Sequence, residues 1–101
     1  MKYKVIIGPE AEVDLKEAFS WYEDKRTGLG YDFLLRIDAG INFINRNPEI
    51  HPIEYKRTRK HLIKRFPYKI IYFVKEEKII ILAVIHGNRR PDLIKKRMDN
   101  I

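Results

Sequence analysis

The 101-residue sequence contains no cysteine, which excludes disulfides and thiolate metal sites as sources of its stability. It also lacks a long hydrophobic run. The longest, residues 79–85, has seven residues, whereas a helix that spans a bilayer takes about 20. The apolar run near the N-terminus is too short for a signal peptide. We therefore expect a cytoplasmic protein of one domain, residues 1–101, with no membrane partner.

Acidic residues are absent from residues 55–75. Residues 51–101 hold 14 Lys/Arg against 5 Asp/Glu, whereas residues 1–50 hold 7 against 9. Positive charge concentrated in one half of a chain favours a surface for an anionic partner over a general aid to solubility. The residues predicted to bind a target or a partner protein through this surface are Arg57, Arg59, Lys60, Lys64, Arg65 and Lys69.

Motifs for most small-molecule chemistry are missing as well. His51, His61 and His86 are dispersed along the sequence, and none has a second ligand at helical spacing, so no metal site is predicted. Gly28 and Gly30 lack the lysine and hydroxyl of a phosphate-binding loop. We therefore expect no cofactor.

The first half of the chain has the apolar spacing of two amphipathic helices. Pro9 suits the first turn of a helix, and the acidic residues after it lie at the positive end of the helix dipole. Gly40, in the second helix, fits either a close approach to the first helix or an exposed position. The predicted segments are a strand at 3–7, a helix at 9–25, a connection at 27–30 and a helix that ends at 47.

The apolar spacing changes from helical to alternating at residue 54. Residues 79–85 are apolar at nearly every position, so we expect this strand to be central and covered on both faces. The sequence therefore predicts an α+β fold of order β-α-α-β-β-β-α, with a helical hairpin on one face of a mainly antiparallel sheet. The predicted segments are strands at 54–59 and 61–66 (or one bent strand), 68–75 and 78–85, and a short C-terminal helix at 91–99.

Four aromatic residues have predicted positions. Trp21 and Tyr22 are adjacent on the first helix and cannot both face the core, so this pair is a candidate contact for a partner. Tyr68 and Tyr72 share one face of a strand and are expected to pack on the helices.

Cationic residues are predicted to converge near the ends of the last strands. A concave site of this composition could hold phosphates through charge-assisted contacts. It could also cleave RNA without a metal, with a base that deprotonates the 2′-OH and cations that stabilise the intermediate. A solvated basic face and a structural histidine are the alternative interpretations. The candidates for a ribonuclease site are Arg59, Lys60, His86, Arg89 and Arg97.

The order and spacing of several segments resemble the RelE/ParE toxins of type II toxin–antitoxin systems. Residues 65–68, which lead into the next strand, and His86 followed by Arg89 and Arg97 resemble the ParE-like branch. The resemblance implies a helical hairpin packed on an antiparallel sheet with a C-terminal helix. The segments that carry it are PEAEVDLKEAFSWYE, GLGYDFLLRID, RKHLIKRFPYKIIYFV and VIHGNRRPDLIKKR.

The resembled family divides by mechanism, so function does not follow from the fold. RelE-like members cleave mRNA in the ribosome with lysines, arginines and a C-terminal tyrosine. Here Lys60 matches one lysine, Leu62 takes the place of the second, and Lys69 takes the place of an arginine. No tyrosine follows Tyr72. ParE-like members are implied to inhibit DNA gyrase by binding, and to be neutralised by an acidic antitoxin that folds onto them.

Three hypotheses for the function follow. The first is a ParE-like toxin that acts on an essential cytoplasmic target, DNA gyrase, and has a cognate acidic antitoxin as its partner. The second is a ribosome-dependent endoribonuclease that acts on mRNA. The third is an inactive basic binding domain.

Overall fold

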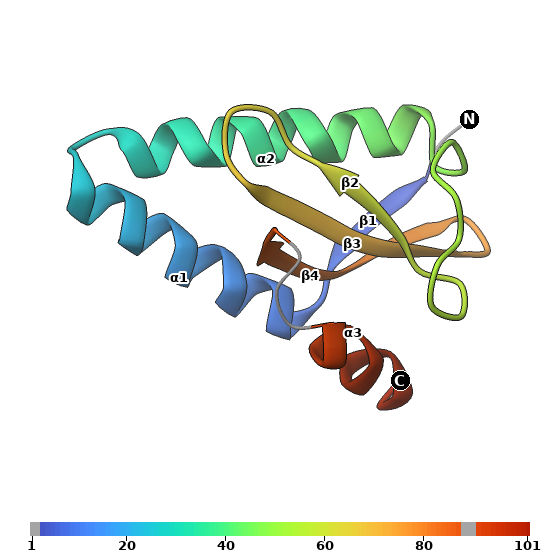
Figure 1. Ribbon diagram of the computed structural model, residues 1–101. Helices are drawn as coiled ribbons and strands as arrows, with labels where there is room; N and C mark the ends of the chain where they lie inside the picture. Colours follow the sequence, from blue (N-terminus) through green and yellow to red (C-terminus); the bar gives the residue numbers. More distant parts are fainter. Residues whose placement is uncertain (1–2, 88–90) are drawn as a thin grey trace.

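The computed structural model describes residues 3–87 and 91–101, and within them the chain forms a helical hairpin, a four-stranded sheet and a C-terminal helix (Figure 1). The order β-α-α-β-β-β-α is the predicted one. None of the helices in these residues is long and apolar enough to span a membrane. The elements are β1 Lys4–Ile7, α1 Pro9–Lys25, α2 Leu29–Arg46, β2 Arg59–Leu62, β3 Tyr68–Lys75, β4 Lys78–His86 and α3 Pro91–Asp99.

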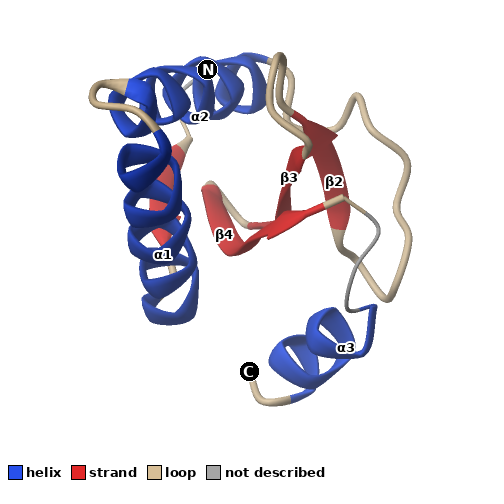
Figure 2. Cartoon of the chain, turned by 60° about the vertical axis from the view of Figure 1, so that its left-hand side comes forward, coloured by secondary structure: helices blue, strands red, loops and turns tan. Residues whose placement is uncertain are grey.

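The sheet has the strand order β1-β4-β3-β2. β3 pairs antiparallel with both β2 and β4, whereas β1 pairs parallel with β4, with Val5 opposite Ile79. β4 is thus an inner strand, and Figure 2 shows the hairpin and α3 on different sides of the strands. Its apolar residues are buried because both faces are covered, as the sequence predicted.

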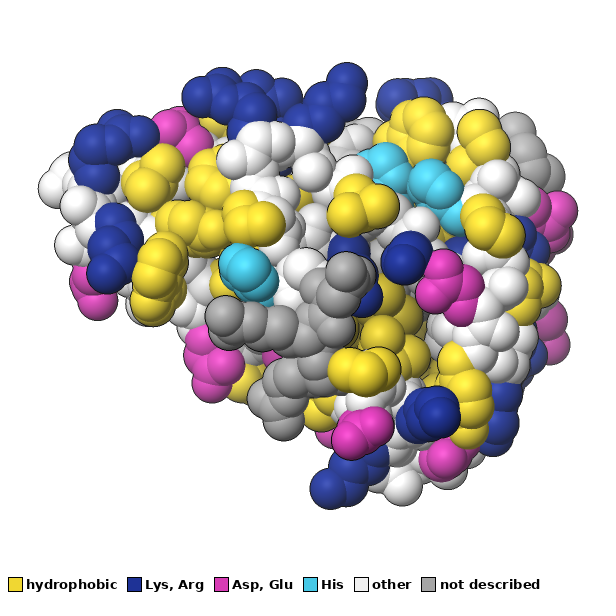
Figure 3. Space-filling model, viewed as in Figure 1, with side chains coloured by type: hydrophobic (Ala, Val, Ile, Leu, Met, Phe, Trp, Pro, Cys, Tyr) yellow, Lys and Arg dark blue, Asp and Glu magenta, His cyan; other side chains and the backbone are white. Residues whose placement is uncertain are grey.

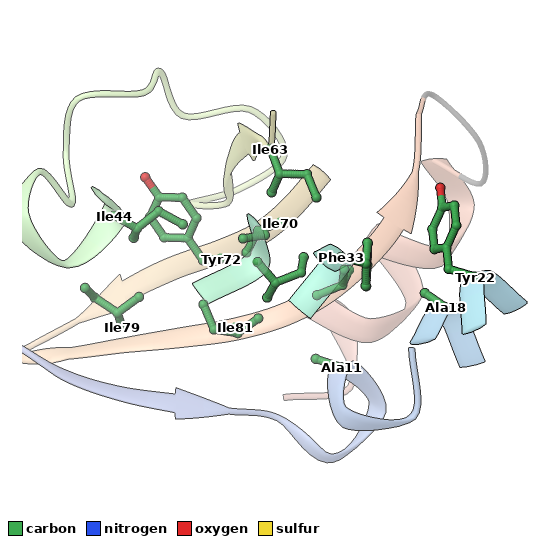
Figure 4. Close-up of a cluster of buried hydrophobic side chains, with 12 residues drawn as sticks. Ala11, Ala18, Tyr22, Phe33, Ile44, Ile63, Ile70, Tyr72, Ile79 and Ile81 are labelled. Carbon is green, nitrogen blue, oxygen red and sulfur yellow. The ribbon is translucent and has the colours of Figure 1, made fainter. Parts of the chain in front are cut away.

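The larger core lies between the helical hairpin and the sheet (Figure 4). Tyr22 of α1 packs against Phe33 of α2, with ring centroids 5.3 Å apart, and edge-on to Phe66 at 4.9 Å. Tyr68 and Tyr72 belong to this core, which confirms that they pack on the helices. A smaller core fills the space under α3 and consists of Ile71, Phe73, Leu82, Ala83, Ile85 and Met98.

Two glycines of α2 allow close packing. A Cβ on Gly30 would lie 2.7 Å from the Phe19 ring, so this residue sets the approach of α1 to α2. A Cβ on Gly40 would lie 3.0 Å from Ile70 and 3.1 Å from His61. Gly40 is therefore buried against the sheet, and neither predicted position for it, next to the first helix or exposed, was right.

The two strands predicted at 54–59 and 61–66 were wrong in extent. Only residues 59–62 form β2. Before it, the Thr58 N–H donates to the Tyr55 carbonyl at 2.9 Å and closes a turn. Glu54 to Thr58 therefore do not continue the strand.

The segment after β2 is irregular as well. Arg65 has a φ of 74°, in the left-handed region that few side chains adopt. Ile63 is buried and Phe66 packs on the same larger core, although the two residues are three apart. In a regular strand they would point to opposite faces, so their shared core does not fit the predicted strand at 61–66.

Candidate functional site

A groove of about 930 Å³ lies between α1, the end of β4 and α3. Residues of α1 form one wall, the end of β4 and the turn before β3 form the floor, and α3 forms the other wall. A groove of this kind suits a peptide or a protein segment better than a small ligand, because it lies open between elements. Its lining is Val13, Asp14, Glu17, Ala18, Trp21, Tyr22, Pro67, Tyr68, Val84, Ile85, His86, Leu93 and Arg97.

Trp21 and Val13 form an exposed apolar rim on the α1 wall. Trp21 is 56% exposed and Val13 is 52% exposed. The Lys25 ammonium lies 4.5 Å above the Trp21 ring, and Tyr22 packs edge-on to it at 5.1 Å. Tyr22 itself is buried in the core, which confirms that the adjacent pair cannot both face inward. Of the two predicted contact residues, Trp21 is the one at the surface.

A buried ion pair lies at the bottom of the groove. Arg97 of α3 donates to both carboxylate oxygens of Asp14 of α1, at 2.6 and 3.0 Å. It also donates to the Leu82 carbonyl at 3.1 Å, and Asp14 accepts from the Val84 N–H at 3.0 Å. The bond to Asp14 raises the pKa of Arg97 above its usual value. Arg97, a candidate for ribonuclease chemistry, is therefore engaged in holding three elements together.

The last residue of β4, His86, lies in the groove. Its ring packs edge-on to Tyr68, with centroids 5.3 Å apart. Its Nδ1 atom is buried and has no hydrogen-bond partner among the described residues. Arg89, another ribonuclease candidate, lies outside the described residues.

A basic patch occupies the α3 side of the sheet, next to the groove. Lys60 and Lys69 lie on this face with Leu62, which pairs directly with Lys69, while Ile85 pairs with Lys69 from β4. Lys60 makes an ion pair with Glu54 at 3.5 Å. Figure 3 shows basic side chains beside an acidic one near the middle of this face.

Of the remaining predicted basic residues, Arg57 lies on the same side of the sheet, Arg59 lies on the other side, and Lys64 and Arg65 lie on a turn. Arg59 points to the hairpin side of the sheet and donates to the backbone carbonyls of Glu49, at 3.1 Å, and His51. The Arg57 guanidinium lies over the Phe73 ring at 4.9 Å. Lys64 and Arg65 are exposed on the turn after β2. Arg59 and Lys60, neighbours in sequence, therefore lie on opposite faces of the sheet.

Two histidines meet, although they are dispersed in the sequence. His51 Nε2 and His61 Nδ1 share a hydrogen bond of 2.9 Å, and the Phe43 ring stacks on His61 at 5.0 Å. Two histidine side chains in contact are visible on the face in Figure 3. Burial lowers the pKa of both, with a further contribution from Arg59 at His51. No group of three or more potential ligands that could hold a metal occurs among the described residues.

Asp14 is a residue of the groove that the sequence did not predict. A signal for it did exist, because Asp14 lies three residues after Ala11 and four before Ala18, within the buried stripe of α1. An acidic residue in such a stripe predicts a buried partner of opposite charge. The histidine pair gave no comparable signal, since it depends on how an irregular segment folds back.

Residues 5–91 match the family model described as the ParE toxin of type II toxin-antitoxin systems, parDE. The chain belongs to the ParE toxin family. Toxin ParE2 of Mycobacterium tuberculosis is 33% identical over 85 residues, which cover 83% of this chain and 81% of that protein. The predicted resemblance to the ParE-like branch is therefore confirmed, and the chain is a ParE-type toxin of a type II toxin–antitoxin system.

Solved structures confirm the predicted fold. The chromosomal ParDE system of P. aeruginosa contains a chain that matches with a TM-score of 0.77 at 16% identity, covering 86% of this chain and 98% of that one. A mutant of E. coli toxin RelE in the free state matches with a TM-score of 0.70 at 11% identity, covering 100% and 99%. This chain, the ParDE structure and RelE thus share one fold.

Proposed function

We propose that this ParE-type toxin inhibits DNA gyrase, an essential cytoplasmic target, by binding it, and that a cognate acidic antitoxin neutralises the toxin. The observation that carries the binding mechanism is the spread of the ribonuclease candidates. Arg59 and Lys60 lie on opposite faces of the sheet, and Arg97 is held by Asp14. A metal-free cleavage site needs its base and its cations around one phosphate.

The groove supports the second half of the proposal. It combines an exposed apolar rim, Trp21 and Val13, with a neighbouring basic patch on the sheet. An acidic segment that folds on binding would bury the rim and pair with the patch. The charge difference between the halves of the chain fits such a partner.

The test uses the purified full-length chain in two assays run side by side. DNA supercoiling by gyrase, with cleaved DNA as a second readout, is expected to be inhibited. Translated mRNA in a cell-free translation reaction is expected to stay intact. The control adds the product of the reading frame next to this one, which we expect to restore supercoiling.

Three other results of these assays would change the proposal. Early cleavage of translated mRNA with normal supercoiling would replace the gyrase proposal by the endoribonuclease. No effect in either assay, with a folded chain, would indicate an inactive binding domain. Inhibition that the neighbouring gene product does not relieve would remove that protein as the antitoxin.

A further inference from the structure

Lys69 is a buried cation without a counter-ion. It lies on an inner strand of the sheet, and only 7% of its surface is exposed, which is unusual for a lysine. No carboxylate among the described residues lies within ion-pair distance of its ammonium group. Burial lowers the pKa of Lys69, the positive charge of Lys60 lowers it further, and the Glu54 carboxylate acts in the opposite direction. The fold thus covers most of this lysine side chain and leaves its ammonium group without an ion pair in the part of the chain that the structure describes.

Such an arrangement gives the isolated protein little stability. The covered stem contributes as an apolar side chain would, and an apolar residue of similar volume is usually as good as, or better than, a charge that makes no ion pair. Ile85 and Leu62, the direct neighbours of Lys69 on β4 and β2, show that an apolar side chain would fit this surface. The lysine therefore needs a reason other than the stability of the free chain.

The other buried cation of the chain is treated differently. The Arg97 side chain is 10% exposed, and its guanidinium is met by both oxygens of Asp14 and by the Leu82 carbonyl. The sequence can therefore supply a carboxylate within hydrogen-bond distance where a cation is structural, as Asp14 does for two nitrogens of Arg97. At Lys69 no carboxylate of the described residues lies at that distance.

We propose that Lys69, with Lys60 beside it, forms a binding site for one carboxylate of an acidic peptide segment, supplied by the antitoxin. This inference rests on the proposed function, because it assigns the site at which the partner is held. A carboxylate would form a charge-assisted hydrogen bond with the Lys69 ammonium. The peptide around it would cover Leu62, which is 63% exposed next to Lys69.

The charges around the site favour a peptide over a nucleic acid. Glu54 already lies 3.5 Å from the Lys60 ammonium, so one unpaired positive charge remains. A single carboxylate matches that charge. A nucleic-acid strand carries a phosphate at every step, and the Glu54 carboxylate would repel the phosphates on either side of the one bound.

The decisive variant is Lys69→Met, which keeps the length of the side chain and removes the charge. We expect the melting temperature of the free full-length chain to rise by about 2–5 °C, because a buried unpaired charge is removed. We expect its affinity for the product of the adjacent reading frame, measured by calorimetry, to fall by about 30-fold or more, since the partner carboxylate would lose its cation. Lys75→Met, at the exposed end of the same strand, is the matched control and should change neither quantity.

A higher melting temperature together with a lower affinity for the partner distinguishes a binding residue from a structural one. A lower melting temperature with unchanged affinity would overturn the inference, as would an unchanged affinity alone.

A second binding experiment uses single-stranded RNA and duplex DNA oligonucleotides. If Lys69→Met weakens their binding and leaves the protein partner unaffected, the site is a phosphate site and the proposal is wrong. If the wild-type chain does not bind the neighbouring gene product at all, the proposed antitoxin partnership fails and the inference fails with it.

Discussion

Asp14 joins three elements of the structure through its carboxylate. It accepts hydrogen bonds from Arg97 and from the Val84 N–H, and so joins α1 to α3 and to β4. β1 pairs with β4 only up to Ile81, so the Val84 N–H lies beyond the last pair of that ladder. The Asp14 carboxylate therefore accepts a hydrogen bond that a longer β1 would accept with its backbone.

Replacing Asp14 with Asn should destabilise the protein by about 3 kcal/mol. The change removes the closer negative partner of the Arg97 guanidinium and leaves only the exposed Glu10 carboxylate at 4.0 Å. Removing one partner of a buried ion pair is strongly destabilising. Urea unfolding followed by circular dichroism measures the effect. Asp38→Asn, an exposed position on α2, serves as the control and should change the free energy of unfolding by less than about 0.5 kcal/mol. A similar loss in both variants would mean that the ion pair is not the cause.

At the scale of elements, the segment between α2 and β2 is long and irregular but well attached. The Tyr72 hydroxyl donates to the Pro48 carbonyl at 3.1 Å. Arg59 donates to two carbonyls of the same segment, and His51 bonds to His61 of β2. Three contacts from the sheet therefore hold this segment in place of regular structure.

The histidine contact makes the stability of the protein sensitive to mild acid. The pKa values of His51 and His61 are lowered in the folded state, so the unfolded chain takes up protons first as the pH falls. Stability should be complete above about pH 6.5 and should decline as the pH drops through the lowered pKa values. Arg59 and Lys64, the charged groups that act on the pair, oppose its protonation.

Urea unfolding at about pH 7.5 and about pH 5.5 measures this dependence. His61→Gln removes one titrating group, and we expect the difference between the two pH values to shrink in this variant. His86→Gln is the control, because this histidine lies outside the contact. An equal pH dependence in the wild type and in His61→Gln would show that the pair does not cause it.

At the scale of the whole molecule, charge is divided between sequence halves and, in consequence, between elements. Residues 51–101 carry 14 of the 21 Lys/Arg residues, whereas α1 holds six Asp/Glu against two Lys. Binding of the neighbouring gene product should therefore weaken about ten-fold or more between about 0.1 M and about 0.5 M salt, because salt screens exposed charges. Calorimetry across a salt series tests this. A flat response would mean that apolar contacts of the groove dominate the affinity.

The architecture was predictable because it rests on periodic patterns. The apolar stripes of α1 and α2 and the continuous apolar run of β4 each have one interpretation, and the structure agrees with it. The ends of β2 were not predictable, since Ile63 and Phe66 are residue types typical of strands but both point into the larger core from an irregular turn. The burial of Lys69 was beyond the sequence as well, because it depends on Leu62 and Ile85 from two neighbouring strands.

The parallel pairing of β1 with β4 has a consequence for how the toxin is made. Val5 pairs with Ile79, and Asp14 pairs with Arg97. The contacts of β1 and α1 therefore cannot form until residues far along the chain are present. Contacts so distant in sequence form late and slow the folding of a small domain. A nascent chain on the ribosome therefore carries the helical hairpin without its sheet until residues 78–97 have been synthesised. The groove is therefore incomplete until β4 and α3 have joined the helical hairpin.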